Sequence, residues 1–282
     1  MTDNYEYFGT YDVDAKATID LEEQIRDWLW SAELMVEFIS VDRPEILDTF
    51  LKIIEAKYSN DLENTTLTLS DVDFHKVRDD SSLLGSYPNI KDFCLLIGLK
   101  YISLEKGYSL SGEKEPTKRL EILRAKHILL YHRITTLVEI LGRENGIQFY
   151  KDFVNYWGKE LAKKEQDTTK YADLRISAVK FYIESNGFEF GVVDIDDYQF
   201  LAKFDKCVWH ESMKDADDQE LAYYTVCYPG PRLSRYNRQN FLVRRTVTLF
   251  DNDFCDELCW DRHVHDEPEQ PSLDFSSRLV PK

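Results

Sequence analysis

The residue types best suited to chemistry gather in the last third of the chain. This part holds four of the five cysteines: Cys207, Cys227, Cys255 and Cys259. A cysteine thiol is a competent nucleophile once its pKa is lowered, and a neighbouring carboxylate can orient a base or carry a proton. Arginines, which recognise carboxylates through two parallel hydrogen bonds, follow in the same region. The last third therefore has the groups needed for a nucleophilic or hydrolytic reaction on a small acid.

Cys255 is the first candidate for the functional thiol, with Asp256 beside it. It follows an acidic turn at residues 251–253, so it can lie at the mouth of a pocket rather than in the middle of a strand. We expect the acidic neighbours to raise the pKa of this thiol, so the hypothesis requires a cation nearby. Cys227 and His210 complete the set of catalytic candidates.

Five residues are candidates for binding the substrate, because each has a polar side chain that can contact a small acid. They are Arg244, Arg245, Cys207, Asp253 and His132. Successive side chains of a strand point to opposite faces, so one of the two adjacent arginines faces a pocket and the other is a solvated charge. The same alternation separates Cys255 from Asp256 unless the strand bends or ends there.

Two other interpretations of these residues stay open. A buried cysteine is commonly a small hydrophobic side chain, and His132 in a long helix is more often a satisfied core histidine than a ligand. Alternatively, two thiolates and two imidazoles could hold a structural zinc ion. That set is Cys255, Cys259, His263 and His265. Its spacing differs from the usual Cys-x2-Cys knuckle, so zinc is the less favoured alternative and no cofactor is predicted.

Composition excludes several classes of partner. The chain has 282 residues and a net charge of -17, which repels phosphate backbones and anionic lipids. No stretch approaches the roughly 20 apolar residues that span a bilayer. The first residues lack the pattern of a signal peptide, and an odd number of cysteines favours reduced thiols. We expect a cytoplasmic protein that binds a small-molecule substrate, with a homodimer left open.

Hydrophobic periodicity predicts an α+β fold. We expect an irregular acidic arm (1–18), a helical region (19–187), a β-rich region packed with the helices as one domain (188–263) and a flexible tail (264–282). Helices are predicted near 20–39, from 44, and over 89–105, 117–142, 145–164 and 171–184, with a long connection at 60–88. The β-rich region contains a strand over 198–209, a short helix over 217–228 that stops at Pro229, and a hairpin over 241–261 whose first strand runs to Leu249.

The order of motifs in the last third resembles a known family. The chain shows Cys207-Val208-Trp209-His210-Glu211, Val226-Cys227-Tyr228, Arg245-Thr246-Val247-Thr248-Leu249 and Asp253-Phe254-Cys255-Asp256. This order is similar to the C-terminal signature of the L-2-amino-thiazoline-4-carboxylic acid hydrolase family, over roughly a fifth of the chain. The resemblance implies a hydrolase, or a ring-opening or ring-closing enzyme, that acts on a C=N, C–S or C–N bond of a small amino-acid-derived substrate.

Three departures from that family pattern indicate a substrate other than the family's namesake, in a setting such as specialised metabolism. Asn252 replaces a glycine, Glu257 replaces a phenylalanine, and residues 228–231 replace an expected acidic residue. The alternative from another class is a non-catalytic small-molecule binding or scaffold protein of the same fold, since fold alone does not decide function.

Overall fold

The computed structural model describes residues 4–18, 20–63, 65–66, 68–69, 77, 80, 82–102 and 116–280. The chain divides into a helical unit, residues 16–157, and a sheet unit, residues 1–15 with 158–282. The boundary between the two units falls within one long helix, and the packing of helices and sheet as one domain stays a prediction. Residues 64, 67, 70–76, 78–79 and 81 of the predicted connection at 60–88 lie outside the described residues. No helix in the described part of the chain is both long and apolar enough to cross a membrane.

The helical unit confirms the helices predicted from apolar periodicity. It contains α1 (Leu21–Asp42), η1 (Pro44–Ile46), α2 (Leu47–Asp61), α4 (Pro88–Tyr101), α5 (Arg119–Leu141) and most of α6 (Arg143–Lys164), with two short paired strands, β2 (Lys16–Thr18) and β3 (Pro116–Lys118). Asp20 caps α1 as expected, because its carboxylate accepts a hydrogen bond from the Glu23 backbone N–H at 3.1 Å. Apolar faces of α2, α4 and α5 pack on one another.

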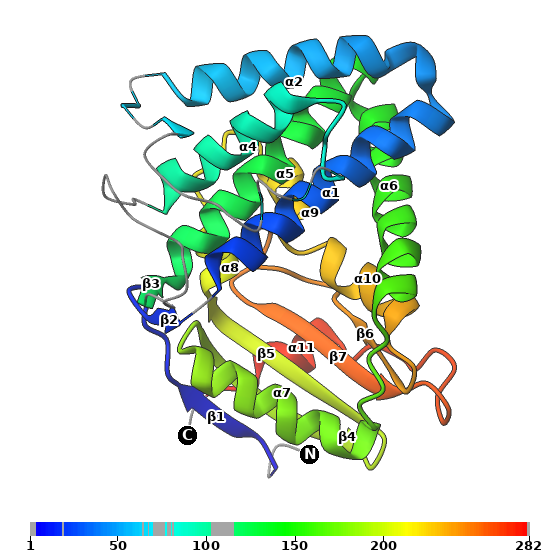
Figure 1. The fold of residues 1–282 in the computed structure, drawn as a ribbon. Helices are drawn as coiled ribbons and strands as arrows, with labels where there is room; N and C mark the ends of the chain where they lie inside the picture. Colours follow the sequence, from blue (N-terminus) through cyan, green and yellow to red (C-terminus); the bar gives the residue numbers. More distant parts are fainter. Residues whose placement is uncertain are drawn as a thin grey trace. The chain divides into compact units, whose positions relative to one another are not determined.

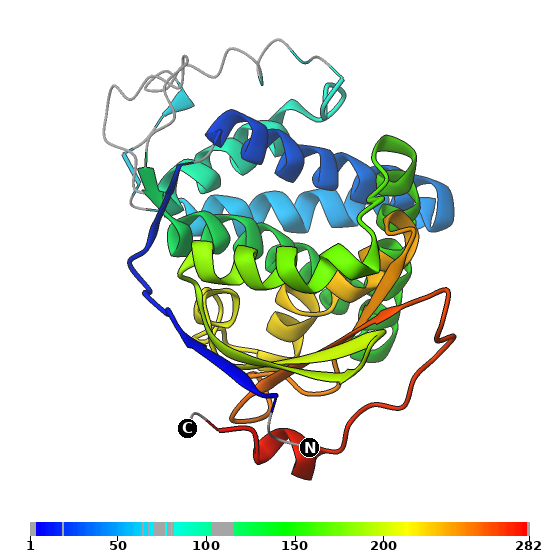
Figure 2. The same ribbon diagram turned by 90° about the horizontal axis from the view of Figure 1, so that it is seen from below.

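The sheet unit is built on a five-stranded antiparallel sheet in the order β1-β4-β5-β7-β6. The strands are β1 (Glu6–Gly9), β4 (Phe188–Asp196), β5 (Gln199–Cys207), β6 (Phe241–Arg244) and β7 (Cys255–Asp261). Its helices are α7 (Tyr171–Ser185), α8 (Val208–Glu211), α9 (Gln219–Val226), α10 (Pro229–Asn237) and α11 (Leu273–Ser277). Helix α7 covers one face of the sheet and α11 lies on the other (Figures 1 and 2). The α+β fold class is thus confirmed, although helices also follow the strands along the chain.

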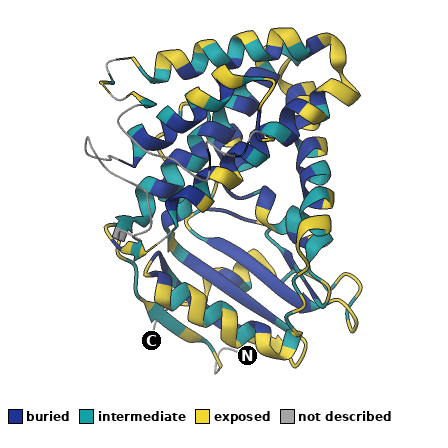
Figure 3. Cartoon of the chain, viewed as in Figure 1, coloured by how far each residue is buried: buried dark blue, intermediate teal, exposed yellow. Residues whose placement is uncertain are grey.

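Aromatic packing fixes α7 on the sheet. Tyr182 of α7 contacts the rings of Phe188, Phe190 and Phe204 with centroids 5.1, 5.2 and 5.0 Å apart. Such edge-to-face contacts add to the burial of apolar area. Strands β4, β5 and β7 are buried along most of their length, whereas the outer face of α7 is exposed (Figure 3). Helix α7 ends at Asn186 in a left-handed conformation, with φ of 49°, as the Asn186-Gly187 pair predicts.

The ends of the chain differ from the prediction. The expected irregular arm contains β1, which pairs with β4 from Glu6 opposite Val192 to Gly9 opposite Glu189. The expected flexible tail contains α11 and docks on the sheet face opposite α7, where Leu279 is 1% exposed. Both segments carry a few apolar side chains that find a partner only in the tertiary structure, so local periodicity missed them.

One predicted boundary in the sheet unit is also wrong. Strand β6 stops at Arg244 rather than Leu249, because the Asp256 carboxylate accepts the backbone N–H groups of Thr246 and Val247 at 2.7 and 3.0 Å. The Asp256 side chain thus accepts the hydrogen bonds that a neighbouring strand would otherwise accept. The predicted short helix does stop before Pro229, because α9 ends at Val226. Pro229 begins a further helix, α10, which was not predicted, since proline suits the first turn of a helix.

Candidate functional site

A pocket of about 370 Å³ lies between α7, α10 and the α7-facing side of the sheet. Phe181 of α7 and Pro231 of α10 line it, and Val243 of β6 and Cys259 of β7 reach it from the sheet. Most of its wall is apolar, and a few charged side chains converge on it. We call this the α7 pocket. Its size and lining are typical of small-molecule sites.

The polar floor of the α7 pocket is a buried ion pair between Arg245 and Glu257. Arg245 Nε and Nη2 donate to Glu257 Oε2 at 2.9 and 2.6 Å, and Nη1 donates to the Cys227 carbonyl at 3.1 Å. The hydroxyl of Tyr182 donates to the other carboxylate oxygen, Oε1, at 2.7 Å. The guanidinium lies 5.7 Å from the centre of the Trp209 ring. Both oxygens of the Glu257 carboxylate therefore accept hydrogen bonds from neighbouring side chains.

The charge states of this group follow from burial and from its partners. Burial alone would raise the pKa of Glu257, but the charge of Arg245 and the hydrogen bonds from Tyr182 and Arg245 hold that pKa below the ordinary value. Burial, followed by the charge of Glu257, raises the pKa of Tyr182 well above the ordinary value. At neutral pH the carboxylate is ionised and the phenol is a hydrogen-bond donor.

The structure brings three of the late cysteines near Arg245. Cys207 ends β5, Cys227 follows α9 and Cys255 begins β7, and their thiols interact electrostatically with one another and with the guanidinium. Burial raises the pKa of Cys227 to about 12, and it raises that of Cys255 well above the ordinary value, against the lowering effect of Arg245. The thiols are therefore protonated at neutral pH. Burial, rather than the acidic turn that we expected, is the main cause.

Alternation along β7 decides which side chains share the α7 face. Cys259 and Cys255 belong to the apolar cluster under α7, and Cys259 Sγ lies 3.9 Å from Glu257 Oε1. Asp256 points away from that cluster, as the alternation predicts. Its carboxylate accepts hydrogen bonds from Thr246 Oγ1 at 2.6 Å and Gln270 Nε2 at 2.7 Å, in addition to the two backbone N–H groups.

The two adjacent arginines separate as expected. Arg245 lines the α7 pocket, whereas Arg244 contacts the C-terminal segment, with its Nε donating to Gln270 Oε1 at 3.0 Å. Arg244 also lies over the ring of Trp260, with the guanidinium carbon 5.5 Å from the ring centre, so it is packed rather than freely solvated. Asp253 is exposed in the turn before β7.

Neither of the two predicted histidines lines the α7 pocket. His210 of α8 contacts the ring of Phe250 with centroids 4.8 Å apart, and burial lowers its pKa. His132 belongs to the helical unit, where its Nε2 lies 3.2 Å from Asp61 Oδ2. It is a satisfied histidine that helps to lower the pKa of Asp61 against the effect of burial.

The four residues of the zinc alternative do not gather. His263 Nε2 lies 3.2 Å from Asn240 Oδ1, and His265 Nε2 lies 3.3 Å from Asp196 Oδ2. Within the residues that the structure describes, no group of three or more His, Cys, Asp or Glu side chains could hold a metal ion.

Sequence reasoning missed Glu257, Tyr182, Arg238 and Asp167. A signal for Glu257 was present, because Glu257 lies two residues from both Cys255 and Cys259 on one strand and so shares their face. Arg238 and Asp167 come together through an unpredicted pairing, in which the Asp167 N–H donates to the Asn237 carbonyl at 2.7 Å and the Gln239 N–H donates to the Asp167 carbonyl at 3.0 Å.

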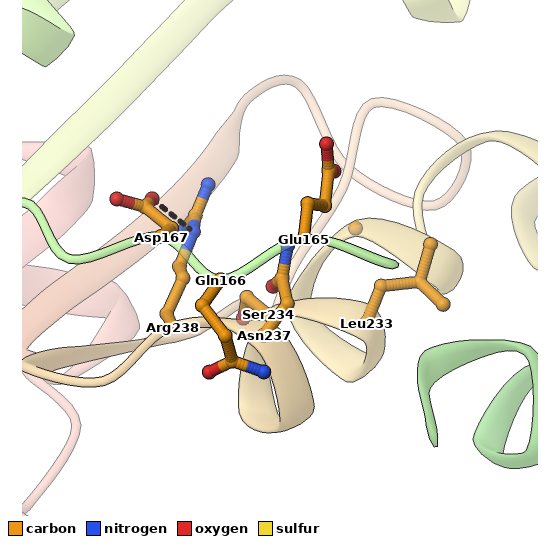
Figure 4. Close-up of a pocket in the computed structure, with 8 residues that line it drawn as sticks. Glu165, Gln166, Asp167, Leu233, Ser234, Asn237 and Arg238 are labelled. Carbon is orange, nitrogen blue, oxygen red and sulfur yellow. Dashed lines mark ion pairs between the residues drawn. The ribbon is translucent and has the colours of Figure 1, made fainter. Parts of the chain in front are cut away.

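Arg238 lines two pockets. A second pocket of about 340 Å³ shares Asp167, Gly230 and Arg238 with the α7 pocket. Arg238 Nε lies 3.5 Å from Asp167 Oδ2, and the close-up shows the two side chains turned toward each other (Figure 4). The guanidinium also lies 4.5 Å from the ring centre of Phe241. This ion pair is longer than that of Arg245, and both side chains are about one third exposed.

No family model, curated protein or solved structure matches this chain. The resemblance to the L-2-amino-thiazoline-4-carboxylic acid hydrolase family therefore stays a prediction.

Proposed function

We propose that the protein binds a small amino-acid-derived acid in the α7 pocket. The observation that carries the proposal is the convergence of two arginines and two carboxylates on a mostly apolar pocket of about 370 Å³. That volume suits a molecule near the lower end of the drug-like range. The apolar wall favours a ligand with a hydrocarbon or thioether body.

The two arginines have different roles in the proposal. Arg245 is committed to Glu257, and separating them would leave two buried charges unpaired. Arg238 is held only loosely by Asp167 and is more exposed, so it is free to turn its planar guanidinium toward a ligand carboxylate. Asp167, once released from Arg238, faces the cationic nitrogen of the same ligand. The ligand class is thus a zwitterion or an amidine acid.

Calorimetric titration tests this proposal with a panel of small acids that includes 2-amino-thiazoline-4-carboxylate, cysteine and their carbon analogues. The Arg238→Met variant removes the proposed carboxylate contact, and we expect at least a tenfold loss of affinity, which is about 1.4 kcal/mol. Arg235→Met is the matched control, because Arg235 is exposed on α10, three residues before Arg238, and does not line either pocket described above. Equal affinity of the two variants, or no binding by any member of the panel, would refute the proposal.

A second candidate is the hydrolase that the family resemblance implies. One observation favours it: the cation that a reactive Cys255 requires is present as Arg245 and lowers the pKa of the thiol relative to burial alone. Opposing it, the thiol remains protonated at neutral pH, and the thiolate is the nucleophile. Steady-state hydrolysis assays with the same panel separate the two functions. A Cys255→Ser variant that binds normally but loses all turnover supports the hydrolase; binding without turnover in the wild type supports the binding protein.

A further inference from the structure

The helical unit contains a buried arginine without a carboxylate partner in the described part of the chain. Arg133, in the middle of α5, is 2% exposed. Its Nη1 donates to Ser31 Oγ at 2.8 Å and its Nη2 donates to the Trp28 carbonyl at 3.3 Å, both on α1. None of the salt bridges among the described residues includes Arg133. A guanidinium is always charged, so this positive charge is buried among neutral groups.

Several polar groups from other helices face the same guanidinium. They are the hydroxyl of Tyr58 on α2, the thiol of Cys94 on α4 and the hydroxyl of Tyr150 on α6. Each of these three residues is no more than 1% exposed. Five helices thus direct a polar group toward one point in the core of the helical unit. We call these residues, with Arg133 and Ser31, the Arg133 centre.

The neutral members of the Arg133 centre supply hydrogen-bonding groups but no countercharge. Burial raises the pKa of Tyr58 and of Tyr150 far above the ordinary value, and it also raises that of Cys94. All three are protonated at neutral pH. The hydroxyl of Tyr150 has no hydrogen-bond partner among the described residues. A buried hydroxyl without a partner is rare in folded proteins, so it points to a group that completes the centre.

We propose that the Arg133 centre binds a small inorganic anion of the size of chloride. The anion would accept hydrogen bonds from the guanidinium and from the Tyr150 hydroxyl, and it would neutralise the buried charge. Helical bundles commonly place ligand sites in the core, where side chains from facing helices converge. A monatomic anion is favoured because fully buried apolar side chains, such as Met35 and Ile39 of α1 and Ile97 of α4, make up much of this core. The anion stabilises the helical unit, and this role is separate from the ligand of the α7 pocket.

Chloride titration of the full-length protein tests the inference. Melting temperatures are measured while chloride replaces gluconate at constant ionic strength. Because an anion that binds only the folded state stabilises it by mass action, we expect the melting temperature to rise by roughly 3–5 °C for each tenfold increase in chloride above the dissociation constant. The Tyr150→Phe variant removes one donor without adding volume, so its chloride response should begin at several-fold higher concentration. Arg124→Met, on the same helix, is the matched control and should respond like the wild type.

Chlorine-35 NMR provides a readout that does not depend on stability. Line broadening in the presence of the wild-type protein, reversed by bromide and absent for Arg133→Met, supports a bound anion. Should Arg133→Met fail to fold, loss of broadening in Tyr150→Phe relative to Arg124→Met decides the question. A melting temperature of the wild type that is independent of chloride, or equal responses of Tyr150→Phe and Arg124→Met, would overturn the proposal.

Discussion

Replacing Glu257 with glutamine should strongly destabilise the sheet unit. The substitution preserves the shape of the side chain but removes the negative charge that faces Arg245 at 2.6 Å, and the two side chains are 8% and 11% exposed. The arginine is then buried without a countercharge. Loss of one partner of a buried pair costs about 3–5 kcal/mol. Glu184→Gln, in an exposed ion pair with Lys180 on α7, is the control and should leave stability nearly unchanged.

The pH dependence of the same pair has a defined sign. Burial opposes ionisation of Glu257, but Arg245 outweighs it, so the pKa in the folded protein is below that of an unfolded glutamate. The contribution of Glu257 is therefore fully present above about pH 4.3, the ordinary glutamate pKa, and is lost as pH falls through the lowered value. The wild type should lose this stability on acidification, whereas Glu257→Gln should lack this part of the dependence.

Urea denaturation at pH 7 and at several lower pH values measures both effects. The double variant Arg245→Met, Glu257→Leu should recover most of the stability lost in Glu257→Gln, because replacement of both charges by apolar side chains is often neutral or stabilising. A loss below about 1 kcal/mol in Glu257→Gln would refute the reasoning, since it would place the pair in effectively aqueous surroundings. A double variant less stable than Glu257→Gln would refute it as well.

Three further predictions concern the same unit. Iodoacetamide should alkylate Cys227 and Cys255 slowly in the native protein at pH 8 and rapidly in urea, because burial raises both thiol pKa values; fast native labelling of Cys255 below pH 8 would instead support the nucleophile. Asp256→Ala should cost about 3 kcal/mol in urea unfolding, because it leaves the Thr246 and Val247 N–H groups without their acceptor; a near-neutral effect would show that water replaces the carboxylate. Leu279→Ala should cost about 2–4 kcal/mol if the C-terminal segment is docked as described, and no change in stability would show that it is not.

Local sequence patterns were sufficient for the long helices and for the fold class. The period of apolar residues and caps such as Asp20 and Asn186-Gly187 act within a few residues, so α1 and α7 could be placed closely. Strand β1 and the docked Leu279 could not, because a short segment becomes ordered only when a distant strand or sheet face accepts it. The end of β6 depends on the side chain of Asp256, and the spacing of apolar residues does not predict such a hydrogen bond.

The candidate site was predicted in part. Alternation correctly separated Arg244 from Arg245 and Cys255 from Asp256, since it is a property of any strand. The chemistry of the cysteines depended on burial, and the sequence suggested the acidic turn as the main influence instead. Tyr182 and Arg238 come from elements far apart along the chain, so only the tertiary structure brings them to the α7 pocket.

The most direct test of the central claim is a crystal structure of the protein with the acid from the panel that binds most tightly. The account predicts electron density in the α7 pocket, with the ligand carboxylate on Arg238 and with the Arg245–Glu257 pair unchanged. Density for the ligand at another place, or in the α7 pocket with its carboxylate turned away from Arg238, would contradict the account.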